Sequence, residues 1–399
     1  MKADVPAIEG GKAVWDEFLV FGSPFVGEDE IREVVDSLRS GWWGMGPKVA
    51  RFQDEFAQYV GARHAIACNS CTAAMHLSLL VAGVGAGSEV ITSPMTFAAT
   101  ANVILHTGAE PVFVDIDAAT LNMDVKQFEE RVTSRTKAVM PVHMAGRPCE
   151  MDVIRDVALR HGLTVVQDCA HAIEAEWHGS KVGSLGDLAC YSFYVTKNLA
   201  TSEGGMVVTG DDGWADRMRT LSLHGLSRDA WRRYGEKGFA HYAVLEPGYK
   251  YNMTDIQASL GLHQLARIES NWQRRDAIWT RYDEAFAGLP LATPPPLDKC
   301  TRHARHLFTI LLELEHLRVS RDEFAAALQA ENIGCGIHFI GLHLHDYYRD
   351  RFGFRPEDFP NATFVSERTL SLPLSAKLTD EDLGDVIEAV RKLMRYYKR

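Results

Sequence analysis

Between residues 28 and 209, short β-rich runs alternate with helical stretches, and few folds accommodate such a pattern. Seven runs are predicted to be strands: Ala65–Cys68, Glu89–Thr92, Pro111–Asp115, Ala138–Val142, Thr164–Asp168, Leu188–Phe193 and Met206–Thr209. Four stretches between them have helical apolar spacing: Ala73–Gly83, Ala98–Thr107, Val125–Val132 and Met151–His161. This alternation predicts an α/β fold with a mainly parallel sheet covered on both faces. Such sheets bind ligands at the carboxyl ends of their strands, so residues that follow a strand are site candidates.

The rest of the chain departs from this alternation. Residues Leu226–Tyr251 mix basic, aromatic and glycine residues and predict a long loop, and a helical region then extends to about Phe286. The proline-rich segment LPLATPPPLDK is the best candidate for a domain boundary. Four later elements predict a smaller α+β domain: His306–Leu312, a helix from Ser320, Ile333–Phe339 and a last helix from Thr379. The predicted domains are a large one, residues 1–265 with the segment 1–27 included, and a small C-terminal one, residues 266–399.

Composition excludes several classes of protein. Hydrophobic residues make up 46% and charged residues 24% of the 399 residues, the balance of a folded globular protein. The formal net charge of -11 argues against binding to nucleic acid or to an acidic membrane. No apolar run approaches the roughly 18 residues of a membrane helix, and the first twenty residues lack a secretion-signal pattern. We therefore expect a cytoplasmic protein with no membrane or nucleic-acid partner.

The seven cysteines are odd in number and scattered along the chain. Cys68 and Cys71 have CxxC spacing, but no second pair accompanies them, so neither a zinc site nor any other metal site is predicted. We expect buried thiols in a reducing compartment.

The segment TVVQDCAH, residues 164–171, places a carboxylate at the carboxyl end of a predicted buried strand. A buried Asp168 requires a cation or several hydrogen-bond donors, because an isolated charge there is costly. A protonated pyridine nitrogen is one such partner, since the pairing keeps the ring able to act as an electron sink. Asp168 could equally cap the turn that follows the strand.

The segment YSFYVTKNLATSEGGM, residues 191–206, carries a single lysine after a predicted strand. Lys197 has hydroxyl-bearing neighbours inside a largely apolar stretch, where a lysine can lose its proton and act as a nucleophile. Taken singly, the motif is also compatible with a solvated surface lysine, which is the usual place of this residue type.

The segment CNSCTAAMHLSLLVAG, residues 68–83, places polar residues between a strand and the start of a helix. Free backbone N–H groups at a helix N-terminus, together with hydroxyl groups, form an anion site that needs no lysine. The GxxxxGK[ST] pattern of a P-loop is absent, so ATP is not implied.

These segments, together with SPMTFAATAN and PGYKYNMTDIQAS, follow one another in an order that resembles the DegT/StrS family of sugar aminotransferases. The resemblance extends from GWWGMGPKV, which begins at Gly41, to the final helix. It implies fold type I of the pyridoxal-phosphate-dependent transferases, with a mainly parallel seven-stranded sheet in the large domain and a smaller α+β C-terminal domain. The implied cofactor is pyridoxal 5′-phosphate, alternating with its pyridoxamine form.

The resemblance also implies roles for individual residues. Lys197 becomes the Schiff-base lysine, Asp168 the partner of the pyridine nitrogen, and His171 a residue against or near the ring hydroxyl. The phosphate would be held by Thr72, by Ser192 and by the backbone N–H of Cys71.

Two further cofactor contacts follow from the resemblance. Phe97 would stack on the ring, although a core phenylalanine at a helix start is the alternative. Asn252 would reach the phosphate of the neighbouring subunit, which implies a homodimer with shared active sites. Cys71 departs from the small residue expected at its position, so only its backbone contact is expected to persist.

The implied activity is transamination of a nucleotide-linked keto sugar with L-glutamate as amino donor and 2-oxoglutarate as product. Related sugar dehydratases carry His where Lys197 stands, so Lys197 favours transamination and a proton shuttle by its free amine. The alternatives are a dehydratase-like or non-transaminating sugar-nucleotide-binding member of the same fold. A nicotinamide oxidoreductase is disfavoured because no GxGxxG follows the first strand.

The substrate-binding candidates are Arg228, Lys250, His338 and His343. The segments HGLSRDAW and VLEPGYKYN, with IGCGIHFIGLHLHDYYRDRF, resemble family members that make UDP-4-amino-4-deoxy-L-arabinose from a 4-keto pentose. Arg228 belongs to a group of cations that could close over a diphosphate, or it could be part of a solvated loop. The first choice of substrate is a 4-keto sugar on UDP, used in polysaccharide or lipopolysaccharide biosynthesis.

Overall fold

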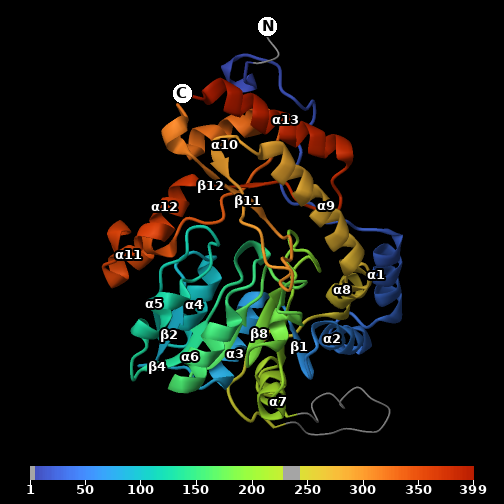
Figure 1. Cartoon of the computed structure of the whole chain (residues 1–399). Helices are drawn as coiled ribbons and strands as arrows, with labels where there is room; N and C mark the ends of the chain where they lie inside the picture. Colours follow the sequence, from blue (N-terminus) through green and yellow to red (C-terminus); the bar gives the residue numbers. More distant parts are fainter. Residues whose placement is uncertain (1–4, 228–242) are drawn as a thin grey trace.

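The computed structural model describes residues 5–227 and 243–399. Its large unit contains a seven-stranded sheet of order β1-β9-β8-β5-β4-β2-β3 (Figure 1). The strands are β1 (His64–Cys68), β2 (Glu89–Thr92), β3 (Glu110–Phe113), β4 (Thr136–Met140), β5 (Thr164–Asp168), β8 (Leu188–Ser192) and β9 (Gly205–Thr209). β9 is antiparallel to both of its neighbours, and the other pairs are parallel. The mainly parallel seven-stranded sheet is therefore confirmed.

Helices cover both faces of this sheet, because alternate residues of a strand point to opposite faces. In β1, Ile66 packs with the apolar sides of α3, α4 and α7, whereas Ala67 packs with α2 and α8. The α5–α6 region covers β2, β4 and β5. The helices are α1 (Glu28–Ser40), α2 (Pro47–Val60), α3 (Cys71–Val81), α4 (Ala98–His106), α5 (Val125–Phe128), α6 (Met151–His161), α7 (Asp212–Leu221), α8 (Asp255–Ala266) and α9 (Ile268–Phe286).

The small unit packs helices on a three-stranded sheet of order β10-β11-β12. Its strands are β10 (Leu291–Ala292), β11 (Phe308–Leu312) and β12 (Thr369–Leu372). Its helices are α10 (Arg321–Ala330), α11 (Asp346–Phe352), α12 (Pro360–Arg368) and α13 (Asp380–Tyr397), and a two-stranded hairpin of β6 (Glu176–Trp177) and β7 (Ser180–Lys181) lies in the large unit. The predicted element Ile333–Phe339 is not a strand, since it forms only isolated bridges, from Ile333 to Leu19 and from Gly336 to Ser371.

Residues 5–19 of the N-terminal segment lie against the small unit, whereas Phe25 contacts α8 of the large unit, to which the sequence assigns the whole segment. The buried Glu331 carboxylate accepts hydrogen bonds from the backbone N–H groups of Ala7 and Val14, at 2.8 and 2.9 Å. The Lys392 ammonium pairs with the same carboxylate at 2.9 Å and also donates to the Lys12 carbonyl. A buried carboxylate with this many donors ties the segment to the C-terminal helix.

Helix α9 connects the two units. Its first residue packs in the core of the large unit and its last two turns pack in the core of the small one. In between, the Arg275 guanidinium forms an ion pair with Glu174, which follows β5, and both side chains are almost completely buried. Burial lowers the pKa of Arg275 and raises that of Glu174, and each charge offsets the effect on the other.

Replacing Arg275 with Ala is expected to lower the free energy of unfolding by about 3–5 kcal/mol, because Glu174 would keep a buried charge without its cation. A urea titration measures the loss. The matched control is Arg281→Ala on the same helix: Arg281 is half-exposed and pairs with Asp380, so the expected loss is about 0–1 kcal/mol. Equal losses in the two variants would contradict this account of the pair.

Candidate active site

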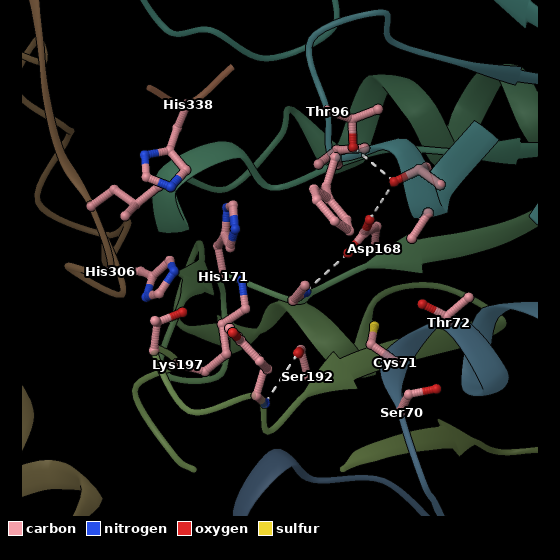
Figure 2. Close-up of a pocket in the computed structure, with 18 of the residues that line it drawn as sticks. Ser70, Cys71, Thr72, Thr96, Asp168, His171, Ser192, Lys197, His306 and His338 are labelled. Atoms are coloured by element: carbon pink, nitrogen blue, oxygen red, sulfur yellow. Dashed lines mark hydrogen bonds between the residues drawn. The ribbon is translucent and has the colours of Figure 1, made fainter. Parts of the chain in front are cut away.

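A cavity of about 530 Å³ opens at the carboxyl ends of the parallel strands. Its lining comes from residues after β1, β2, β4, β5 and β8 and from the segments around His306 and His338 of the small unit. In Figure 2, Thr96, Asp168 and the start of α3 gather on one side, and His171, His306 and His338 on the other. The cavity therefore lies where the parallel topology predicts a ligand site.

Asp168 ends β5 and is buried, with its carboxylate facing this cavity. One carboxylate oxygen accepts a hydrogen bond from the Thr100 hydroxyl at 2.8 Å, and the other accepts from the Ala170 backbone N–H at 3.0 Å. The Thr96 hydroxyl contacts that of Thr100 at 2.7 Å. Burial raises the pKa of Asp168, and these donors and the Lys197 charge oppose the rise. The carboxylate is thus held in place and can receive a cation from a ligand.

Lys197 lies in the turn after β8, where its backbone N–H donates to the Tyr194 carbonyl at 2.8 Å. The residue is partly exposed as a whole, but its amino group is enclosed in the cavity. Burial lowers the pKa of Lys197 to about 8, although the Asp168 carboxylate opposes this. At that pKa roughly a tenth of the side chains are uncharged at pH 7. Lys197 has the environment of a nucleophile rather than that of a solvated surface lysine.

The N-terminus of α3 forms another wall of the cavity. The Ser70 hydroxyl caps the helix by accepting a hydrogen bond from the Ala73 N–H. The N–H groups of Cys71 and Thr72 have no helical partners, because they lie in the first turn. The side chain of Ser192, at the end of β8, also lines the cavity. At Gly205 an added Cβ would lie 2.5 Å from the Cys71 backbone nitrogen, so a glycine is required where β9 passes this helix start. The arrangement suits an anion such as a phosphate.

His171 presents a defined face to the cavity. Its Nδ1 accepts a hydrogen bond from the Ala145 backbone N–H at 3.2 Å, and its ring lies 4.5 Å from that of His306 and 6.0 Å from that of Phe339. Burial and the charge of Lys197 hold the pKa of His171 well below its ordinary value. His171 is therefore a neutral imidazole that offers an Nε2–H group.

Phe97 precedes α4 and lines the cavity with 63% of its surface exposed. Its ring lies 6.2 Å from that of Phe339, which belongs to the small unit. The alternative of a core phenylalanine is therefore wrong, and the ring is open to a planar ligand.

The substrate candidates occupy different environments. His338 lines the cavity, its Nδ1 lies 3.0 Å from the Ser371 hydroxyl, and burial lowers its pKa to about 4. His343 is instead fully buried against Phe359 and contacts Thr363 at 2.9 Å, so it does not line the cavity. Its place in the core corrects the expectation that it forms part of the sugar pocket.

Lys250 and Asn252 lie outside the cavity, next to the β1 end of the sheet. The Lys250 ammonium donates to the Asn252 side-chain oxygen at 2.6 Å, and Asn252 pairs with Cys68 in an isolated bridge. The structure brings neither residue to the cavity of its own chain. Arg228 lies outside the described residues.

Several site residues were missed by sequence reasoning. Thr100 holds the Asp168 carboxylate. His306 lines the cavity together with Lys197. Asn198 follows Lys197 in the chain and contacts His306. The only signal for His306 is a histidine at the start of a predicted β-rich run, and nothing in the sequence connects it with Asn198, 108 residues earlier.

Within residues 5–227 and 243–399, no cluster of three or more His, Cys, Asp or Glu has an arrangement that could hold a metal ion. In the same ranges no helix is both long and apolar enough to cross a membrane. All seven cysteines are free thiols, and five of them are buried.

Comparison with known proteins identifies relatives over nearly the whole chain. The protein is 51% identical over 381 residues to the spore coat polysaccharide biosynthesis protein SpsC of Bacillus subtilis, covering 95% of this chain and 98% of the relative. It resembles a putative sugar aminotransferase, Spr1654 of Streptococcus pneumoniae, solved in its PMP form, with 34% identity, a TM-score of 0.88 and coverage of 95% and 98%.

A structure of lower sequence identity is also that of an aminotransferase. PseC of Helicobacter pylori, an aminotransferase of pseudaminic acid biosynthesis, has 27% identity and a TM-score of 0.88, with coverage of 96% of this chain and 100% of that one. The Streptococcus enzyme was also solved in its PLP form. The buried carboxylate, the enclosed amine and the open helix N-terminus provide what pyridoxal 5′-phosphate requires, and this is the cofactor. The model of the DegT/DnrJ/EryC1/StrS aminotransferase family matches residues 24–391, and the chain belongs to this family.

Proposed function

We propose that the protein transfers the amino group of L-glutamate to a keto sugar carried by a nucleotide, with a UDP-linked 4-keto sugar as first choice. The observation that carries this proposal is the convergence of Lys197, Asp168 and the N-terminus of α3 on one cavity. Family members of the dehydratase type carry His at the lysine position, so Lys197 favours transamination.

Each part of the cofactor has residues that suit it. Asp168 would face the ring nitrogen, and the N–H groups of Cys71 and Thr72 with the Ser192 hydroxyl would hold the phosphate. His171 offers an N–H to the ring hydroxyl, and Phe97 offers an aromatic face. When bound, the cofactor supplies an electron sink for deprotonation at the carbon that bears the amino group.

Lys197 has two roles in the proposed reaction. It binds the cofactor covalently through its uncharged amine. Once released, the same amine would move a proton between the substrate carbon that bears the amino group and the C4′ atom of the cofactor, as general base and then general acid. The pKa of about 8 in the cofactor-free chain suits the first role, because a useful fraction of the amine is uncharged near neutral pH.

The choice of sugar rests on features around the cavity and on the relatives. His338 is the described candidate to contact the sugar, Arg228 remains a candidate for its diphosphate, and Lys250 remains a substrate-binding candidate that lies outside the cavity of its own chain. The similarity to SpsC supports a place in polysaccharide biosynthesis.

We also propose a homodimer in which Asn252 completes the phosphate site of the neighbouring subunit. Asn252 is partly exposed outside the cavity of its own chain, at the edge strand β1. Trp42 and Trp43, which follow α1, are each more than half exposed, as expected of residues that a second subunit would cover.

Replacing Lys197 with Ala is expected to abolish turnover and covalent cofactor binding while the protein stays folded, because the variant lacks the amine. The test is the absorption spectrum with pyridoxal phosphate, before and after L-glutamate, followed by a panel of keto sugar nucleotides. The wild type should show a visible band that glutamate converts to the pyridoxamine form. Borohydride reduction and mass spectrometry should locate the label on Lys197. No band in the wild type, or near-normal turnover in the variant, would overturn the proposal.

Replacing Asp168 with Asn is expected to lower the rate of the glutamate half-reaction by on the order of 100-fold, since a charge aimed at the reacting system is lost. The Asn amide would also direct a donor at the Thr100 hydroxyl or the Ala170 N–H, both of which donate at present. Stopped-flow absorbance after mixing with glutamate measures the rate. A rate equal to that of the wild type would show that the carboxylate only caps its turn.

The rate at which the cofactor-free protein captures pyridoxal phosphate is expected to rise with pH and to level off above about 8. Only the uncharged amine attacks, and burial lowers the pKa of Lys197 from its ordinary value. A lysine in water would show the same rise about two pH units higher. The initial rate of band formation across a pH series measures this, and a midpoint near 10 would contradict the enclosed environment.

A further inference from the structure

His306 belongs to a buried hydrogen-bond network next to the cavity. Its Nδ1 lies 3.0 Å from the Asn198 side-chain oxygen. The Asn198 amide nitrogen donates to the Glu174 carboxylate at 2.8 Å and to the Ala304 carbonyl at 2.9 Å. Arg275 completes the network through its ion pair with Glu174.

The chemistry of these partners fixes the orientation of the Asn198 amide. A carboxylate and a carbonyl can only accept, so both must face the amide NH₂ group. The amide oxygen is left to face His306, and it can only accept. The Nδ1 atom of His306 must therefore carry a proton and donate it to Asn198.

A neutral imidazole has one protonated nitrogen, so the Nε2 of His306 carries a lone pair. Burial and the Lys197 charge hold the pKa of His306 well below its ordinary value, which keeps the ring neutral. The residue lines the cavity, and within the described ranges no group donates to its Nε2.

The other histidines of the cavity do not offer a fixed acceptor. The Nδ1 of His171 accepts from a backbone N–H, so its Nε2 carries the proton. The Nδ1 of His338 contacts the Ser371 hydroxyl, which can donate or accept, so this contact leaves its tautomer open. His171 and His306 therefore lie ring against ring with opposite polarity.

We propose that Asn198, held by Glu174 and Arg275, fixes His306 as the Nδ1–H tautomer, which leaves its Nε2 free to accept a hydrogen bond from the Lys197 amino group when that amine turns toward it in the shared cavity. His306 is then a positioning residue that acts through Lys197. Its effect on turnover rests on the proposed function, whereas its tautomer and its effect on cofactor capture do not.

The first test is NMR of the full-length protein labelled with ¹⁵N-histidine, without cofactor and with pyridoxal phosphate, assigned by substitution. His306 is expected as the Nδ1–H tautomer. Three histidines in the same protein serve as references, because the Nδ1 of each accepts from a backbone N–H and predicts the opposite tautomer: His143, His171 and His303. An Nε2–H tautomer at His306 would overturn the proposal.

The second test uses His306→Asn, which keeps a donor toward Asn198 and removes the Nε2 acceptor. Capture of pyridoxal phosphate is expected to slow roughly tenfold at high pH, because the Lys197 amine loses its orientation. The midpoint of the pH profile should fall, since the hydrogen bond to Nε2 favours the protonated amine. His306→Gln, whose amide oxygen extends toward the place of Nε2, should restore part of the rate.

The matched control is His303→Asn, three residues earlier and equally buried but outside this cavity. It should leave the capture rate and its midpoint unchanged. A His306→Asn profile that matches the control would overturn the proposal. If capture behaves as expected but no keto sugar nucleotide is aminated, the proposed function fails and the role of His306 stands.

Discussion

The site depends on the burial of one carboxylate at the end of a central strand. β5 lies between β4 and β8 in the middle of the sheet, so Asp168 is removed from water on all sides except the cavity. A hydroxyl and a backbone N–H hold its two oxygens, and within the described residues no Lys or Arg forms an ion pair with it within 4 Å. Since a buried charge is costly without a cation, this carboxylate suits the protonated ring nitrogen that we propose as its partner.

The small unit completes the cavity, and buried hydrogen bonds and an ion pair hold it against the large unit. The Arg275 guanidinium donates to the Arg305 carbonyl while its charge pairs with Glu174, and Asn198 donates to the Ala304 carbonyl. These contacts fix the backbone just before His306. The fold therefore uses the same buried charges for stability, for joining its units and for directing a histidine into the site.

The sequence predicted the helices, strands and strand-end motifs that local apolar patterning determines. The bounds of β2, β5 and α6 agree with the structure, because each is a continuous run with clear apolar periodicity. The motifs also brought Asp168, Lys197 and Cys71 to one cavity, since strand ends of a parallel sheet meet at one edge. Ile333–Phe339 does not form a strand, because its backbone pairs with distant segments only at isolated positions, Ile333 with Leu19 and Gly336 with Ser371.

Contacts between distant segments could not be predicted, because local sequence patterns do not determine them. His338 and His343 belong to one stretch of sequence, yet one lines the cavity and the other is buried against α12. The spacing of histidines along a loop does not determine which side chain turns inward. The tie between the N-terminal segment and Glu331 spans more than 300 residues and leaves no local signal.

The charge states around the cavity suit the two roles proposed for the Lys197 amine, nucleophile and proton shuttle. Within the described residues, Lys197 is the sole Lys or Arg that lines the cavity, and the three histidines there have pKa values lowered by burial. Neutral imidazoles neither repel the ammonium form of Lys197 nor compete for its proton near neutral pH. The proposed phosphate site is built from helix N–H groups, which would attract an anion without adding an ionisable base. In the proposed reaction, proton transfer near neutral pH would thereby be left to the Lys197 amine.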